Sequence, residues 1–313
     1  MLTHSKINLN KYIPAKRKNG KATTKPVTIH FIKATCARDI SEFIESNHPD
    51  KSASNAMNAH FNDEKWDFSA GFAGISELCK TGWNTGTQSV CDFSDKIREN
   101  YKKNSSYSRD TTGLFFDVSD VIAGVPECYF KKNETRQTKE IQLNISIAGD
   151  FKCPASMLHN RGAAILALVQ TLQSEQWRVK ISLFCALFEY PKNGNEKNPG
   201  YTIARIDLDT KPLDVSELAL ILAHPGFLRR MILATAETVE GCSNLGGYGN
   251  GTLKDTDNRL SGFIGNERRS MLNDVIPVCN NSLNFLEYIN NQDQSFDSPA
   301  SAAEWVKNQI ESI

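Results

Sequence analysis

The middle of the chain alternates between strand-like and helix-like hydrophobic patterns. Apolar residues alternate with polar ones in EIQLNISIAG (140–149), recur at helical spacing in MLHNRGAAILALVQTLQSEQ (157–176), and cluster in WRVKISLFCALFEY (177–190). These periods predict a strand, a long amphipathic helix and a second strand. A strand–helix–strand unit of this length favours a right-handed crossover between parallel strands.

Similar patterns continue toward the carboxyl terminus. YTIARIDLD (201–209) predicts a strand, and residues 212–239 hold two helical stretches divided near Pro225. MLNDVIPVCN (271–280) is a candidate for a last sheet strand. A helix should begin with Ser298 as its N-cap and Pro299 in the first helical position. The pattern predicts an α/β fold with a mostly parallel sheet flanked by helices.

The first third of the chain is mainly helical in pattern. We expect a short strand at 27–34, then helices at 39–49, 67–81 and 86–101, and a polar, hinge-like loop at 102–113. The predicted organisation has three parts: a basic arm without fixed structure over 1–27, a mainly helical region over 28–113, and an α/β domain over 114–313.

Composition narrows the class of protein. The 313 residues are 40% hydrophobic and 23% charged, which is enough to bury a core. No apolar run is long enough for a membrane-spanning helix, and the amino terminus lacks the apolar region of a secretion signal. The eight cysteines form no C-x-x-C pair, so we expect reduced core thiols and not a zinc knuckle.

The zero net charge conceals an uneven distribution. Residues 1–38 carry nine Lys or Arg and no Asp or Glu, which leaves the remainder acidic by nine. Such a segment can neutralise nucleic-acid phosphates or lie on an acidic partner, although a solvated terminus has the same composition. It lacks aromatic residues interleaved for base stacking, which disfavours single-strand binding.

The strand–helix–strand unit resembles the start of a von Willebrand factor A-type domain. In that fold an Asp-x-Ser-x-Ser run at the end of the first strand holds a divalent metal. Here Ser146 matches the first serine, but Asn144 replaces the aspartate and Ala148 the second serine. A hard cation such as Mg²⁺ wants carboxylate ligands, so the motif is degenerate. The residues that remain as candidate metal ligands are Ser146, Asp207 and Asp209, with Asp150 as a further carboxylate.

Other residues are candidates for chemistry without an assigned role. His224 could act as a base, and Arg229 with Arg230 could clamp an anion. The structural alternative is that His224 ends a helix while the arginines lie on the solvent face of the next one.

Three further positions and one glycine-rich run can also be interpreted as either functional or structural. Trp83 fits a core anchor, and Asp117 and Glu127 flank an apolar turn where carboxylates commonly cap or pair. The glycine-rich run 246–251 lacks the lysine of a phosphate loop and is better explained as a surface loop.

Three segments together resemble an uncharacterised, largely bacteriophage-encoded family. They are KTGWNTG (80–86), FDVSDVIAGVPECYF (116–130) and LILAHPGFLRRMILATAE (220–237), with RGAAILALVQTL also fitting. The resemblance spans about 65–240 and implies a phage product made in the host cytoplasm, with a von Willebrand A-like core. The family has no established activity that could be carried over to this chain.

Three functions follow as hypotheses. The first is a protein-interaction module without catalytic activity, docking a partner through the strand end near Ser146 and the helices around His224. The second is a nucleic-acid-associated protein that uses residues 1–38. The third is a metal-dependent enzyme on a phosphate-bearing substrate, with Ser146, Asp207 and Asp209 as ligands and Mg²⁺ as a candidate ion. No complete catalytic signature is present in the sequence, and no other cofactor is expected.

Overall fold

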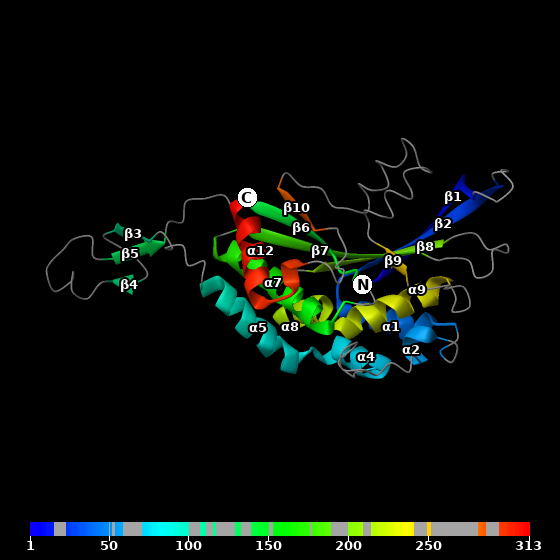
Figure 1. Cartoon of the computed structure of the whole chain (residues 1–313), viewed down its shortest axis with the longest axis horizontal. Helices are drawn as coiled ribbons and strands as arrows, with labels where there is room; N and C mark the ends of the chain where they lie inside the picture. The colour runs from blue at the N-terminus through cyan, green and yellow to red at the C-terminus, as the bar shows by residue number, and fades with distance from the viewer. Residues whose placement is uncertain are drawn as a thin grey trace.

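The structure is a computed structural model of the chain. It describes residues 1–15, 23–49, 51, 54–58, 71–99, 107–110, 115–116, 129–132, 139–149, 153–175, 177–188, 200–208, 214–240, 249–251, 281–285 and 294–313. Within these residues the predicted α/β class is confirmed, because a large sheet is flanked by helices (Figure 1). The predicted strand at 271–280 and residues 246–248 of the glycine-rich run lie outside the described residues.

The main sheet contains seven described strands. In spatial order six of them are β1 (Thr3–Ala15), β2 (Thr23–Ala34), β8 (Gly200–Leu208), β7 (Arg178–Phe188), β6 (Glu140–Ser146) and β10 (Ser282–Phe285); β9 (Gly249–Gly251) pairs with β7. β6 is parallel to β7 and β10, and β2 is parallel to β8. The β1–β2, β7–β8 and β7–β9 pairs are antiparallel. The predicted parallel pairing of β6 with β7 around one helix is therefore confirmed.

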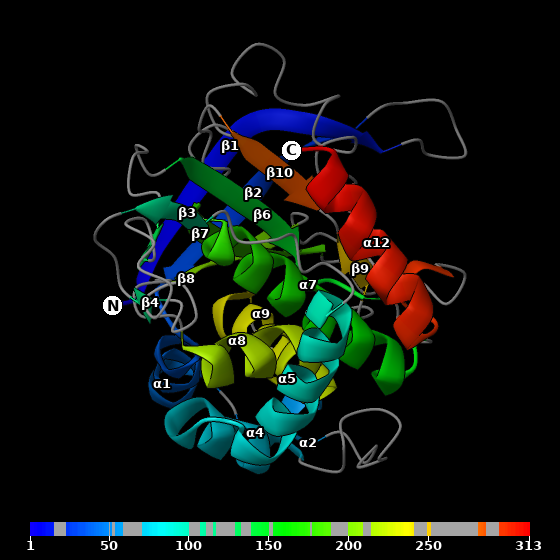
Figure 2. The same cartoon turned by 90° about the vertical axis from the view of Figure 1, so that its left-hand side faces the viewer.

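The described helices gather on one face of this sheet (Figures 1 and 2). They are α1 (Ala37–Asn47), α2 (Asn55–Asn58), α4 (Gly71–Thr81), α5 (Asn84–Glu99), α7 (Ala155–Ser174), α8 (Val215–Ala223), the π-helix η3 (Phe227–Ile232), α9 (Leu233–Glu240), the 3₁₀ turn η4 (Gln294–Phe296) and α12 (Pro299–Glu311). α7 lies centrally and is buried along most of its length. The predicted Ser298 cap of α12 is confirmed, since its side chain accepts a hydrogen bond from the Ser301 N–H.

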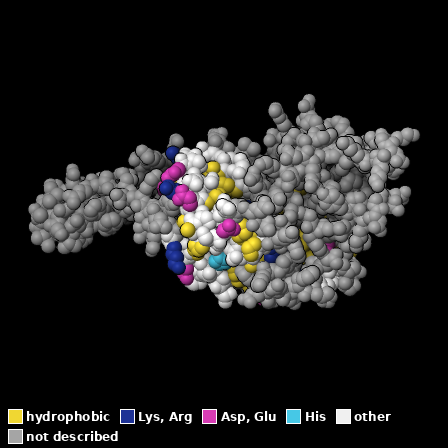
Figure 3. Space-filling view, in the orientation of Figure 1, with side chains coloured by type: hydrophobic (Ala, Val, Ile, Leu, Met, Phe, Trp, Pro, Cys, Tyr) yellow, Lys and Arg dark blue, Asp and Glu magenta, His cyan; other side chains and the backbone are white. Residues whose placement is uncertain are grey.

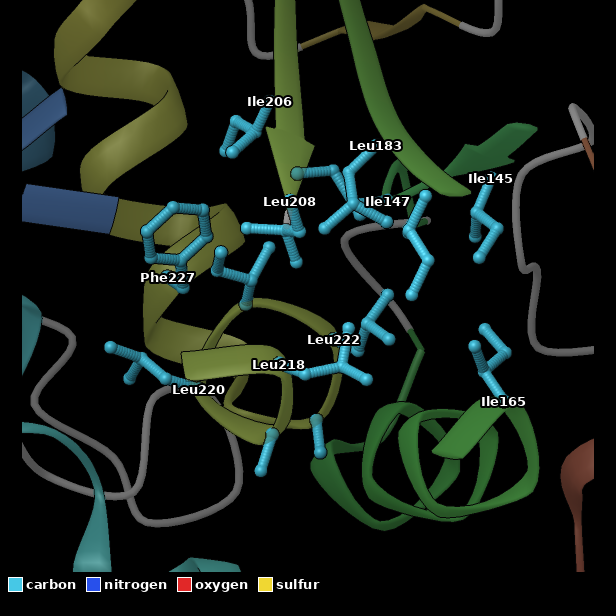
Figure 4. Close-up of a cluster of buried hydrophobic side chains, with 14 of the residues drawn as sticks. Ile145, Ile147, Ile165, Leu183, Ile206, Leu208, Leu218, Leu220, Leu222 and Phe227 are labelled. Carbon is cyan, nitrogen blue, oxygen red and sulfur yellow. The ribbon is translucent and has the colours of Figure 1, made fainter. Parts of the chain in front are cut away.

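Between sheet and helices lies a continuous hydrophobic core. Ile145 on β6, Leu183 on β7 and Ile206 on β8 point toward Leu218 of α8 and Ile165 of α7 (Figure 4). Alternate residues of each strand supply this layer, as the period of two requires. At about 25 cal/mol per Å² of apolar surface removed from water, such a layer is the main source of stability.

The crossing of α7 and α8 depends on one glycine. A Cβ added at Gly162 would lie 2.4 Å from the Ala223 Cβ and 2.7 Å from its Cα. Because no real side chain tolerates such contacts, the two helices approach at this point only as long as residue 162 has no Cβ. The small residue in the otherwise periodic α7 pattern therefore sets the depth of packing.

The amino-terminal region differs from the expectation. The sequence predicts an arm without fixed structure over residues 1–27, but Thr3–Ala15 is a strand and pairs with Thr23–Ala34. Strand pairing satisfies the backbone donors and acceptors of a polar segment without many apolar side chains. This is why a composition typical of coil concealed a hairpin.

The boundary predicted at 113/114 does not separate two cores. Buried residues on both sides of it, such as Ile40 and Leu143, belong to one hydrophobic cluster, and β2 joins the same sheet as β8. The predicted loop 102–113 also contains a strand, β3 (Tyr107–Asp110). It pairs with β5 (Tyr129–Lys132), which also pairs with β4 (Phe115–Phe116) in a small separate sheet.

The cysteines and the apolar helices were both subjects of prediction. Five cysteines lie among the described residues and all are free thiols: Cys36, Cys79, Cys91, Cys153 and Cys185. Burial raises the pKa of Cys79 and of Cys185 to about 12, which keeps both protonated. Among the described helices, none is by itself long and apolar enough to cross a membrane; α8 and the segment 227–239 would satisfy that test only as a pair bent by 69°.

Candidate functional site

The most unusual charged feature is the hairpin of β1 and β2 at one edge of the sheet. We call residues 3–34 the basic ribbon: two paired strands joined by residues 16–22. Its sequence contains eight Lys or Arg and no acidic residue, and four of these basic residues lie in the joining segment. The register runs from Thr3 opposite Lys33 to Ala15 opposite Thr23, with an irregularity between Leu9 and Ile13.

The basic ribbon extends away from the helical layer. In Figure 1 the two blue strands leave the body of the molecule at one end, beyond β8. Only the carboxyl-terminal part of β2 pairs with β8, because that pairing begins at Thr28. The remaining part of the hairpin has no other strand partner among the described residues.

A row of polar side chains crosses the sheet face opposite the described helices. Asp207 on β8 accepts hydrogen bonds from Arg205 Nε and from Ser182 Oγ, both at 2.6 Å, and lies 3.2 Å from the Lys33 ammonium. Burial alone raises the pKa of the Asp207 carboxyl, but the hydrogen bonds from Arg205 and Ser182 outweigh it and hold that pKa below its ordinary value.

The row continues through neutral side chains. Gln142 Nε2 donates to Ser182 Oγ at 3.2 Å and to Asn144 Oδ1 at 3.3 Å, and Asn144 Nδ2 donates to Asn284 Oδ1 at 2.8 Å. Gln142, Asn144 and Ser182 are buried. The sequence signal for this row is the polar half of the strand alternation, of which only Asn144 and Ser146 belong to the predicted metal motif.

The structure does not bring the candidate metal ligands together. Ser146 lies opposite Phe184 on one side of β7, whereas Asp207 lies opposite Ser182 on the other side. With a strand between them, the two are separated by roughly 10 Å. Asp209 and Asp150 lie outside the described residues. Within the described part of the chain, no group of three or more His, Cys, Asp or Glu could hold a metal ion.

Ser146 is buried at the end of β6. Its Oγ accepts from the Ala148 N–H at 3.3 Å, and its carbonyl accepts a hydrogen bond from the Arg161 guanidinium. The side chain therefore caps its own strand end and does not face solvent. The strand end near Ser146, which was expected to dock a partner, is therefore not exposed at this residue.

His224 and Trp83 have structural roles, as the alternative interpretation expected. His224 is the C-cap of α8, its Nδ1 accepts from the Gly226 N–H at 3.0 Å, and its ring meets Trp83 edge-on at 4.6 Å. Burial lowers the pKa of His224 to about 4, so the ring is neutral at pH 7. Trp83 is 8% exposed and belongs to the core.

The two arginines contradict their predicted position on the solvent face. Arg229 is 5% exposed and donates to the Cys153 carbonyl, while Arg230 is 1% exposed and donates to the Ala56 carbonyl at 3.0 Å. Both lie on the π-helix η3, whose wider turn the sequence pattern did not reveal. Each guanidinium fixes the backbone of a distant segment.

Sequence patterns also do not single out a buried carboxylate on α9. Glu237 is fully buried, accepts hydrogen bonds from Ser54 Oγ and the Ala56 N–H, and lies 3.7 Å from His48 Nε2. It fixes the segment that follows α1 against α9. The only signal for it in the sequence is that it is the single acidic residue in the largely apolar run 227–239.

A shallow groove lies between α5, α7 and the start of α12. Its lining includes Ser89, Asp92, His159, Asn160 and Pro299, and its volume is about 560 Å³. Ser89 Oγ lies 3.3 Å from His159 Nε2, and burial lowers the pKa of His159. In Figure 3 the described part of this face shows acidic and basic side chains interspersed, with no single large charged patch. Asp117 and Glu127 lie outside the described residues.

Comparison with known proteins identifies a family whose function is unknown. Curated proteins and solved structures contain no significant match to this chain. One family model, described as a domain of unknown function (DUF7192), matches residues 16–303. Since that match covers most of the 313 residues, the chain belongs to the DUF7192 family.

Proposed function

We propose that this protein binds double-stranded nucleic acid through the basic ribbon. The observation that carries the proposal is a paired two-stranded hairpin at the sheet edge whose sequence has eight basic and no acidic residues. Lysine and arginine side chains neutralise backbone phosphates and release the counterions that condense on them. A binding mode of this kind is independent of base sequence.

The dimensions of the basic ribbon support a duplex as the ligand. The major groove of B-form DNA accommodates a two-stranded β-ribbon. At about 3.3 Å per residue, the 13 residues of β1 extend over roughly 40 Å, which is slightly more than one turn of the duplex. Residues 1–38 also lack the interleaved aromatic side chains on which unpaired bases would stack.

The charge of the rest of the chain supports one orientation of binding. Outside residues 1–38 the protein has nine more acidic than basic residues. A polyanion is therefore repelled by the body and attracted by the basic ribbon, which steers the encounter toward one end of the molecule.

Among the described residues, those suggested for protein docking and for a metal site are buried or already paired. Docking of a protein partner was expected around Ser146 and His224, but these residues are 1% and 3% exposed. A Mg²⁺ site was expected to use Asp207, whose carboxylate is engaged by Lys33, Arg205 and Ser182. Neither hypothesis is supported by a contact in the described residues.

From the family resemblance we also propose that the protein is a phage product made in the host cytoplasm and that its core is von Willebrand A-like. The parallel β6–α7–β7 unit supports this likeness. The antiparallel neighbour β8 in the middle of the sheet departs from it.

The test is a salt series of binding measurements. Fluorescence anisotropy with a labelled duplex of roughly 30 base pairs should give an affinity that falls by about 10³ or more between about 50 and 200 mM salt, if six or more phosphates are contacted. The triple variant Lys16→Gln, Arg17→Gln, Lys18→Gln should reduce the slope of log affinity against log salt by roughly three.

A matched variant separates the basic ribbon from general charge. Lys51→Gln, Lys96→Gln, Lys139→Gln removes the same charge from exposed positions elsewhere and should leave the slope unchanged. Equal weakening by the two triple variants, or no binding at about 50 mM salt, would contradict the proposal. Tighter binding of single-stranded than of duplex DNA would contradict the choice of ligand.

A further inference from the structure

Two histidines meet at the base of the basic ribbon, across the β1–β2 pair. His4 lies opposite Ile32 and His30 lies opposite Lys6, so the two histidines are diagonal neighbours on one face of the hairpin. His4 Nε2 and His30 Nδ1 are 3.0 Å apart, and their ring centroids are 5.3 Å apart with an interplanar angle of 23°. Two ring nitrogens from different strands therefore face each other directly.

The surroundings of the pair favour neutral imidazole rings. His30 is 6% exposed, and the ring of Phe43 on α1 makes a T-shaped contact with His4, with 6.1 Å between ring centroids. Burial, followed by the charge of Lys6, lowers the pKa of His4. Burial, followed by the charges of His4 and Lys6, lowers the pKa of His30 to about 4. Neutral imidazole is the form that binds a metal ion.

We propose that His4 and His30 together bind a borderline divalent transition-metal ion such as Zn²⁺, Ni²⁺ or Cu²⁺. Two imidazole nitrogens on one tetrahedral Zn²⁺, each about 2.0–2.1 Å from the ion, are roughly 3.3 Å apart, so the nitrogens need to separate by a few tenths of an ångström while both rings turn to aim their lone pairs at the ion. The exposed His4 ring can make the larger part of this adjustment, and water completes the coordination sphere. Imidazole ligands select such ions over Mg²⁺ and Ca²⁺.

Binding redistributes the protons of the pair without releasing them. In the metal-free pair one ring nitrogen donates its hydrogen to the other. On binding, both facing nitrogens give their lone pairs to the ion, and the ring that was the donor carries its hydrogen on its other nitrogen. Because both rings are already neutral at pH 7, no net proton leaves the protein. The heat of binding should then be independent of the ionisation enthalpy of the buffer.

The site joins the first strand of the sheet to the second, and it is independent of whether the basic ribbon binds nucleic acid. A metal bridge between His4 and His30 would hold β1 in its register against β2. A ligand that binds the folded state alone also raises its stability by mass action.

The experiment uses the full chain without an affinity tag. Calorimetric titration with Zn²⁺ at pH 7 should show saturable binding near one ion per chain, and Mg²⁺ should give no heat. With free Zn²⁺ at about 100 times its Kd, the Tm should rise by roughly 4 °C. His4→Gln should weaken Zn²⁺ binding at least tenfold. His4→Cys, which retains a ligand at this position, should restore it in reducing buffer.

Control variants make the outcome decisive. His159→Gln removes a histidine of the α5–α7 groove and should leave Zn²⁺ binding unchanged, whereas Lys6→Gln should tighten it because a neighbouring positive charge is removed. Because His4 is exposed, loss of binding in a His4→Gln protein with an unchanged circular dichroism spectrum supports the site. Unchanged binding in that variant, or no saturable binding to the unaltered chain, overturns the proposal.

Discussion

At the scale of single residues, several polar and charged side chains are buried together with the apolar core. The expectation that His224 ends a helix and Trp83 anchors the core is confirmed, because both follow from local rules for caps and large apolar rings. The expectation for Arg229 and Arg230 is wrong. Sequence spacing could not reveal that η3 is a π-helix, or that backbone carbonyls of distant segments accept from these guanidinium groups.

His224 should make stability sensitive to acid. The neutral ring is favoured in the fold, so the contribution is fully present above the ordinary pKa of about 6.5 and is lost as the pH falls toward about 4. Between pH 7 and pH 5 the unfolding free energy should fall by about 2 kcal/mol from this residue. Urea denaturation at both pH values should show a smaller pH difference in His224→Gln. An equal difference in both proteins would contradict the assignment; His30 adds a similar dependence to both.

Asp207 should matter more to stability than a carboxylate at the surface. Asp207→Asn removes the partner of Lys33 and Arg205 and should cost about 1–3 kcal/mol of unfolding free energy, because the Arg205 side chain is only 12% exposed. The matched control is Glu140→Gln, whose solvent-screened pairing with Lys180 should contribute much less to the same free energy. Urea denaturation of both variants measures the contrast, which vanishes if the polar row is not formed.

At the scale of elements, long periodic segments were predictable and edge strands were not. β6, α7, β7 and α8 follow hydrophobic periods that one face of each must bury, so their positions came from the sequence within a few residues. β1 lies at the edge, and backbone pairing with β2 holds it without a strong apolar pattern. Likewise, the polar row could not be predicted from the sequence, because the pattern of one strand does not reveal which strands lie beside it in the sheet.

The close approach of α7 and α8 can be tested by adding a Cβ at Gly162. Gly162→Ala should destabilise the fold by about 1–3 kcal/mol, although alanine is the better helix former, because the new Cβ would collide with Ala223. Ser156→Ala, at an exposed position of the same helix, should change stability by less than about 0.5 kcal/mol. Thermal denaturation measures both, and a stabilising Gly162→Ala would contradict the close approach of the two helices.

At the scale of the whole molecule, the helical first third and the sheet share one core. Ile40 and Val90 pack in the same cluster as Leu143 and Leu183, so the two regions predicted from the hydrophobic pattern should not fold separately. Thermal unfolding followed by tryptophan fluorescence and by far-ultraviolet circular dichroism should therefore give a single shared transition. Two separated transitions, or a stably folded fragment of residues 114–313, would contradict this expectation.

The order of strands has a consequence for how the protein is made. β2 pairs with β8, about 170 residues later in the chain, and β6 pairs with β10 about 140 residues later. While the ribosome is still synthesising the segments after β7, the early hairpin and the growing sheet both present unpaired edges, which are sites of aggregation. Premature termination before Gly200 would therefore leave a product with open strand edges, whose removal would fall to the chaperones and proteases of the cell.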